Sequence, residues 1–115
     1  MTERQPPIVL IVDDDQGIRD TLEAILKKSY RVIQAGDGET ALRLVNEREV
    51  RVVLLDIRLP GIDGMEVLKQ IKERYDDVEV VMITAVREVE TAVQAMKLGA
   101  YDYITKEFNY DEVVN

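Results

Sequence analysis

Residues 52–56 read Val-Val-Leu-Leu-Asp, four branched apolar residues followed directly by a carboxylate. Such a run is typical of a strand buried on both faces in the middle of a parallel sheet. It places Asp56 at the carboxyl edge of the sheet, where ligands bind in open α/β folds. The loop that follows, residues 57–64, carries one Pro and two Gly and must turn sharply. Asp is also a common loop and capping residue, so this strand alone indicates little about function.

Further strands and helices alternate on both sides of this strand. Strands are predicted at residues 8–12, 31–35, 78–84 and 101–105. Apolar residues at helical spacing predict helices marked by Ile18–Leu26, by Ala41 to about Arg48, by about Gly64 to Tyr75, and by Val89–Met96 with Gly99 closing it. A fifth helix starts at residues 111–114 and looks cut short, which suggests a fragment of a longer protein.

The alternation predicts one α/β domain over residues 1–115, with residues 1–7 as a disordered polar lead. We expect a flavodoxin-like, doubly wound parallel sheet of five strands in the order 2-1-3-4-5, with helices on both faces. A chain of 115 residues with 46% apolar and 33% charged residues can bury its own core.

Composition excludes several kinds of chemistry. The chain has no Cys and no His, which removes disulfides, thiolate sites and the commonest general base. The net charge of -8 argues against direct binding of nucleic acid or of anionic membranes. No apolar stretch approaches the roughly 20 residues of a membrane span, and the N-terminus lacks a signal-peptide core. A cytoplasmic protein is therefore expected.

Polar residues that carry chemistry gather at one edge of the predicted sheet. Asp13 and Asp14 follow the first strand, Asp56 the third, Thr84 ends the fourth and Lys106 follows the fifth. Strands one and three are neighbours in the order 2-1-3-4-5, so three carboxylates would converge. Two unit charges about 5 Å apart repel by roughly 3 kcal/mol at an effective dielectric near 20, so such a cluster is tolerated when a cation or a protonated partner offsets it.

Oxygen ligands alone favour Mg²⁺, held by carboxylates, waters and a phosphate. Lys106 would supply a positive charge and Thr84 a hydroxyl donor, an arrangement that suits phosphoryl transfer. A carboxylate can itself act as the nucleophile and form an aspartyl phosphate. Simpler roles exist for each residue: acids at the start of a helix, expected above all for Asp15, a cap for Thr84 and a solvated loop charge for Lys106. Their joint position at strand ends favours the functional interpretation.

At these residues the sequence resembles the response-regulator receiver family of two-component signalling, from residue 8 to residue 114. The matching motifs are Ile-Val-Asp-Asp-Asp at 11–15, Leu-Leu-Asp at 54–56 with Leu-Pro-Gly-Ile-Asp-Gly at 59–64, Ile-Thr-Ala at 83–85, and Gly-Ala-Tyr-Asp-Tyr-Ile-Thr-Lys at 99–106. The resemblance implies that Asp56 accepts a phosphoryl group from a histidine kinase. It also implies that Asp13, Asp14, Asp56 and the backbone carbonyl of Arg58 bind Mg²⁺.

The resemblance further assigns a switch to Thr84, Lys106 and Tyr103. Thr84 and Lys106 would contact the phosphoryl oxygens, and Tyr103 would swing inward as Thr84 moves. The alternative for Tyr103 is edge-strand packing with its hydroxyl in water. The change would reach the face of the fourth helix and fifth strand, and through it an output domain or partner. Such a domain is regulatory, and supports only its own phosphorylation and dephosphorylation.

Residues 95–104 look most like receivers of the nitrogen-regulator class, which precede an ATPase domain and a helix-turn-helix that activate transcription. This likeness implies transcriptional output and leaves room for a phosphorylation-dependent homodimer. One departure is Glu107, where the family has Pro after the Lys. A cis bond costs about 3–4 kcal/mol before a non-proline residue. We therefore expect Lys106–Glu107 to be trans, or cis under strain, in a more mobile loop.

Two other functions remain open from the residues. A phosphatase of the haloacid-dehalogenase type also uses an Asp and Mg²⁺, but its nucleophile ends strand one in an Asp-x-Asp-x-Thr/Val pattern, which fails here at Gly17. A receiver-like interaction domain that is never phosphorylated is the third candidate, and the substitution at Glu107 keeps it open.

Overall fold

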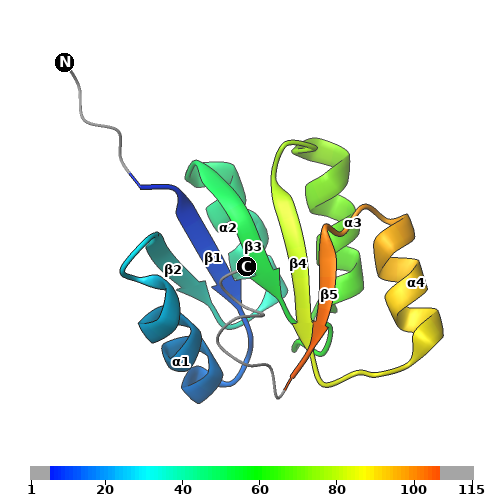
Figure 1. Cartoon of the computed structure of the whole chain (residues 1–115). Helices are drawn as coiled ribbons and strands as arrows, with labels where there is room; N and C mark the ends of the chain where they lie inside the picture. Colours follow the sequence, from blue (N-terminus) through cyan, green and yellow to red (C-terminus); the bar gives the residue numbers. More distant parts are fainter. Residues whose placement is uncertain (1–5, 107–115) are drawn as a thin grey trace.

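The computed structural model describes residues 6–106, which form a five-stranded parallel sheet in the order β2-β1-β3-β4-β5 (Figure 1). The elements are β1 (Ile8–Val12), α1 (Gln16–Leu26), β2 (Arg31–Ala35), α2 (Gly38–Glu47), β3 (Val50–Leu55), α3 (Gly64–Arg74), β4 (Glu79–Thr84), α4 (Val89–Lys97) and β5 (Asp102–Thr105). In Figure 1, α1 lies on one face of the sheet and α2 and α3 lie on the other. The predicted flavodoxin-like order and the helices on both faces are confirmed.

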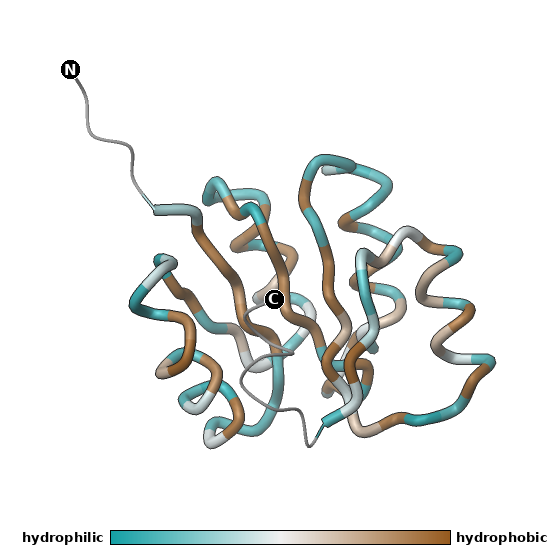
Figure 2. The backbone as a smooth tube through the Cα atoms, viewed as in Figure 1, coloured by the Kyte–Doolittle hydropathy of each residue, from teal (hydrophilic) through white to brown (hydrophobic). Residues whose placement is uncertain are grey.

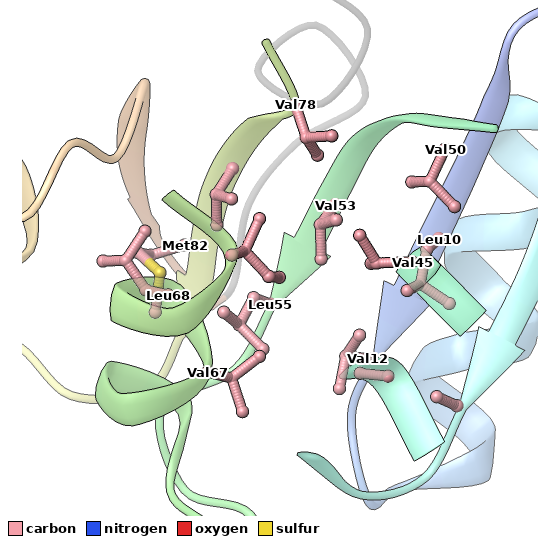
Figure 3. Close-up of a cluster of buried hydrophobic side chains, with 14 of the residues drawn as sticks. Leu10, Val12, Val45, Val50, Val53, Leu55, Val67, Leu68, Val78 and Met82 are labelled. Carbon is pink, nitrogen blue, oxygen red and sulfur yellow. The ribbon is translucent and has the colours of Figure 1, made fainter. Parts of the chain in front are cut away.

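The core lies in two layers because successive residues of a strand point to opposite faces. Leu10 and Val12 of β1 join the larger cluster, which packs against α2, α3 and α4. Val9 and Ile11 join the smaller one, which packs against α1. Figure 2 shows apolar residues running along the central strands, and Figure 3 shows side chains of the larger cluster. Burial on both faces explains why these strands read as continuous apolar runs.

Three strand boundaries differ from the sequence prediction. β3 begins at Val50, two residues earlier than predicted, because Val50 pairs with Ile8 although the exposed Arg51 interrupts the apolar run. β4 begins at Glu79 rather than at residue 78. β5 begins at Asp102, so Tyr101 precedes the strand and is exposed. Residues 1–5 and 107–115 lie outside the described range, and with them most of the predicted lead, the fifth helix and the Lys106–Glu107 bond.

Aspartates cap the three helices that follow β1, β2 and β3. The carboxylate of Asp15 accepts from two backbone N–H groups of α1, which confirms its predicted place at a helix start. Asp63 caps α3 through the N–H of Glu66. Asp37 accepts from the N–H of Thr40 at 2.7 Å, and this hydrogen bond lowers the pKa of Asp37 below its ordinary value. Each cap fixes where the chain turns away from the carboxyl edge of the sheet.

Gly64, the first residue of α3, brings that helix against the end of β3. Its N–H donates to the carbonyl of Ile57 at 2.7 Å. A Cβ atom on Gly64 would overlap the carbonyl oxygen of Asp56 and would lie 2.7 Å from the Cα atom of Ile57. Only glycine therefore lets the α3 terminus approach the backbone that carries Asp56.

We expect Gly64→Ala to destabilise the protein, because the clash is with backbone atoms that cannot turn aside. The free energy of unfolding should fall by about 1–3 kcal/mol, as for an overpacked core. Gly17→Ala is the matched control, since its Cβ would meet only the side chain of Asp15, at 3.1 Å. Urea unfolding of both variants tests this, and an undisturbed Gly64→Ala protein would contradict it.

Asp37→Ala should lower the free energy of unfolding by about 1 kcal/mol at pH 7, the usual value of an N-cap. Because the folded-state pKa of Asp37 is depressed, the charge stabilises the fold above the unfolded pKa. This contribution is lost as the pH falls through the folded-state pKa. Asp37→Asn keeps the cap without the charge, so its deficit should shrink as unfolding is measured from pH 7 towards pH 3. A deficit independent of pH would refute the role of the charge.

Candidate functional site

Three carboxylates converge where β1 and β3 end side by side. Asp13 and Asp14 follow β1, Asp56 follows β3, and the N–H of Asp56 donates to the carbonyl of Val12 at 3.0 Å. Each acid offers an oxygen, and the three oxygens lie within 4.8 Å of one another. Asp13 and Asp56 are 2% and 4% exposed, whereas Asp14 is exposed. The predicted convergence is confirmed.

Lys106 joins these acids from the end of β5. Its Nζ lies 2.9 Å from Oδ2 of Asp56 and 3.0 Å from Oδ2 of Asp13. Its backbone N–H donates to the carbonyl of Thr84 at 2.7 Å, which holds the residue beside β4. The alternative of a solvated loop charge is therefore wrong.

Burial and charge shift the pKa values of this cluster. Burial, with the negative charge of Asp56, raises the pKa of Asp13 above its ordinary value and outweighs the N–H of Asp15 and the ammonium of Lys106, which act in the opposite direction. Burial alone would lower the pKa of Lys106, but the hydrogen bonds to Asp56 and Asp13, together with the negative charges of both acids, outweigh it and raise that pKa. The ammonium therefore stays charged at neutral pH and offsets the buried carboxylates.

Thr84 and Tyr103 meet at Val86 rather than at the acids. The hydroxyl of Thr84, which is fully buried, accepts from the N–H of Val86 at 3.3 Å. The hydroxyl of Tyr103 donates to the carbonyl of Val86 at 2.6 Å. Burial, with the negative charges of Glu88 and Asp56, raises the pKa of Tyr103, so the hydroxyl keeps its proton. The alternative of a capping Thr84 is wrong, since Glu88 occupies the N-cap of α4. The alternative of a Tyr103 hydroxyl in water is also wrong, since that hydroxyl donates to Val86.

The donor set fits a hard divalent cation. The three converging side chains offer only oxygen ligands. Asp13 and Asp56 are buried close together, so their negative charges favour a bound cation. Arg58 donates its N–H to Oδ1 of Asp56 at 3.3 Å, while its side chain is exposed. The predicted role of its carbonyl as a metal ligand stays a prediction.

Sequence patterns did not identify two residues that shape the site. The sequence predicts Gly64 as part of the turn and as the approximate start of a helix, but not its close approach to the backbone of Asp56. Arg19 lies between the apolar positions of α1, where the sequence pattern indicates only a polar helix face, but its Nη1 donates to the carbonyl of Asp13 at 2.7 Å. A glycine directly after the capping Asp63 is a signal for the first, whereas the second contact depends on how α1 docks.

Comparison with known proteins gives consistent matches over almost the whole chain. The family model of the response regulator receiver domain matches residues 9–115. A putative NtrX-like response regulator of Rickettsia typhi is 44% identical over 109 residues, covering 92% of this chain and 23% of that protein. The regulatory protein AtoC of Escherichia coli is 41% identical over 106 residues, covering 91% and 23%. The chain thus spans about a quarter of these relatives' length.

Solved structures agree in fold. The receiver domain of NtrX from Brucella abortus is 40% identical, with a TM-score of 0.86, covering 92% of this chain and 91% of that one. A CheY-like receiver domain protein from Methanospirillum hungatei is 29% identical, with a TM-score of 0.91, covering 96% and 89%.

Between residues 6 and 106, no helix is long and apolar enough to cross a membrane.

The family match, the sheet order and the acids beside Lys106 all point to the same family. This chain belongs to the response regulator receiver domain family, whose members are regulatory domains of two-component systems, and its relatives include NtrX-like regulators.

Proposed function

We propose that this domain is a Mg²⁺-dependent switch in which Asp56 accepts a phosphoryl group from a sensor histidine kinase. The observation that carries the proposal is the position of Asp56: it is buried, lies beside Asp13 and Asp14, and is bonded to Lys106. A carboxylate held in this way is oriented for attack and cannot turn away. Family membership supports a regulatory domain rather than a phosphatase.

In the transfer, a carboxylate oxygen of Asp56 attacks the phosphorus of a phosphohistidine. The phosphorus–nitrogen bond breaks, and its electron pair returns to the imidazole, which takes up a proton. Bound Mg²⁺, held by Asp13, Asp14, Asp56 and the carbonyl of Arg58, would neutralise negative charge on the transferring oxygens. The ammonium of Lys106 donates a hydrogen bond to Asp56. After transfer it would contact a phosphoryl oxygen and stabilise the negative charge of the phosphoryl group.

The signal would leave the site through Thr84. A phosphoryl group on Asp56 would offer a charged acceptor to the Thr84 hydroxyl, which in the described structure accepts a 3.3 Å bond from the N–H of Val86. Turning that hydroxyl towards the phosphoryl group would free Val86 and weaken its 2.6 Å bond with Tyr103. The inward swing of Tyr103 would then alter the face of α4 and β5, where Val89, Val93 and Met96 are exposed.

The partners of this face follow from the relatives. The named relatives are about four times as long as this chain, so an output domain is proposed beyond the receiver. Likeness to NtrX-like proteins and AtoC supports transcriptional control as the output. The proposal takes residues 1–115 as a single receiver domain, with the cytoplasmic location typical of response regulators. A homodimer formed on phosphorylation fits the same exposed face.

Incubation with acetyl phosphate and Mg²⁺ should give a hydroxylamine-sensitive phosphoryl adduct on Asp56, visible by mass spectrometry. Asp56→Asn should abolish the adduct because the amide is not a nucleophile. Asp63→Asn is the matched control: it lies in the loop after β3, keeps an acceptor for its cap and should be labelled like wild type. Label on Asp13 or turnover of phosphate esters would support the phosphatase. No adduct with any donor would support the unphosphorylated binding domain.

Mg²⁺ should stabilise the fold by binding the native acids. At a free concentration one hundred times its dissociation constant, the free energy of unfolding should rise by about 2.7 kcal/mol. Asp13→Asn should remove most of this gain, because one of the three converging carboxylates is lost. Asp77→Asn, an exposed acid in the loop before β4, should keep it. Thermal unfolding with and without Mg²⁺ measures both, and equal gains in the two variants would place the cation elsewhere.

A further inference from the structure

Arg19 of α1 contacts the backbone of the loop that carries Asp13 and Asp14. Its Nη1 donates to the backbone carbonyl of Asp13 at 2.7 Å, and its Nε donates to the side-chain oxygen of Gln34 at 2.9 Å. The guanidinium also lies against the loop after β2, since a Cβ atom on Gly36 would come within 3.3 Å of Nη1. Arg19 is therefore held in one orientation from three sides.

Gln34 fixes that orientation and links it to further charges. While its oxygen accepts from Arg19, its amide nitrogen donates to Glu23 at 2.8 Å and to Asp20 at 3.3 Å. Gln34 lies on β2 beside β1, where its register partner is Ile11. The bonds thus join α1 to the sheet at a point two residues before Asp13.

The carbonyl that Arg19 holds belongs to the peptide between Asp13 and Asp14. Because a peptide is planar, holding its oxygen restrains both ψ of Asp13 and φ of Asp14. The other groups of Asp13 are also engaged: its N–H donates to Ala35 at 3.2 Å, Oδ1 accepts from the N–H of Asp15 at 2.9 Å and Oδ2 meets Lys106. With the bond from Arg19 to its carbonyl, every polar group of Asp13 has a hydrogen-bond or ion-pair partner.

We propose that Arg19, oriented by Gln34, is a positioning residue for the cation site, an inference that rests on the proposed function. It does not touch the cation; it holds the peptide from which two of the ligands project. Two effects of the guanidinium compete, because its positive charge repels a cation whereas its hydrogen bond orients the ligands. A 2.7 Å charge-assisted bond favours the orienting effect.

The test is Mg²⁺ affinity, measured by isothermal titration on the protein and checked by competition with Mn²⁺ in electron paramagnetic resonance. Arg19→Met should weaken Mg²⁺ binding by about tenfold, the usual effect of losing an outer-shell partner. Arg19→Lys keeps the charge and one donor, and should recover part of the affinity. Arg43→Met, which removes an exposed helical Arg paired with Glu47, is the control and should bind like wild type.

Gln34→Leu keeps Arg19 but removes the hydrogen bond that orients its guanidinium. This variant should also weaken Mg²⁺ binding, by a smaller factor than Arg19→Met. In the double variant with Arg19→Met, the losses should not add, because the two residues act as one unit. If Arg19→Met does not fold, Gln34→Leu decides the question alone.

Unchanged or tighter Mg²⁺ binding by folded Arg19→Met would overturn the proposal, and tighter binding would show that charge repulsion dominates. Lower stability without Mg²⁺ at unchanged affinity would also overturn it and leave a purely structural role. Failure of the wild-type protein to bind Mg²⁺ would instead reject the cation site itself.

Discussion

Two buried carboxylates, Asp13 and Asp56, are held side by side by the pairing of β1 with β3. Burying like charges together is unfavourable unless a cation or a donor offsets them. Lys106 does so from the end of β5, with one ammonium close to both acids. This constraint shapes the whole carboxyl edge, because strands, loops and helix starts must bring those groups together and keep them there.

The scaffold around the acids is correspondingly close-fitting. Gly64 lets α3 begin against the backbone of Asp56, and Asp15 both caps α1 and donates its N–H to Asp13. Arg19 of α1 donates to the carbonyl of the peptide between Asp13 and Asp14. The loops after β1 and β3 therefore contribute to positioning as well as to connection, which suits a site where small displacements of reacting groups are costly.

The other side of the site is held more lightly. Among residues 6–106, the hydroxyls of Thr84 and Tyr103 each form a side-chain hydrogen bond with the backbone of Val86, in the segment that leads to α4. The exposed apolar residues of α4 lie beyond it. The proposed switch would use this difference: the acids are fixed by several bonds, whereas the two hydroxyl bonds on Val86 could be exchanged for a bond to a phosphoryl group.

The sequence by itself determined the parallel sheet in its predicted order, the helices on both of its faces and the convergence of Asp13, Asp14, Asp56 and Lys106. Strands buried on both faces are recognisable in the sequence as continuous apolar runs. Parallel strands bring their carboxyl ends to the same edge of the sheet. Local patterns could not show that Val50 joins β3, since pairing with β1 decides that boundary. Nor could they show Arg19 on the Asp13 carbonyl, Gly64 against Asp56 or both hydroxyls on Val86. Those contacts join distant segments, and only the docking of helices and loops onto the sheet decides them.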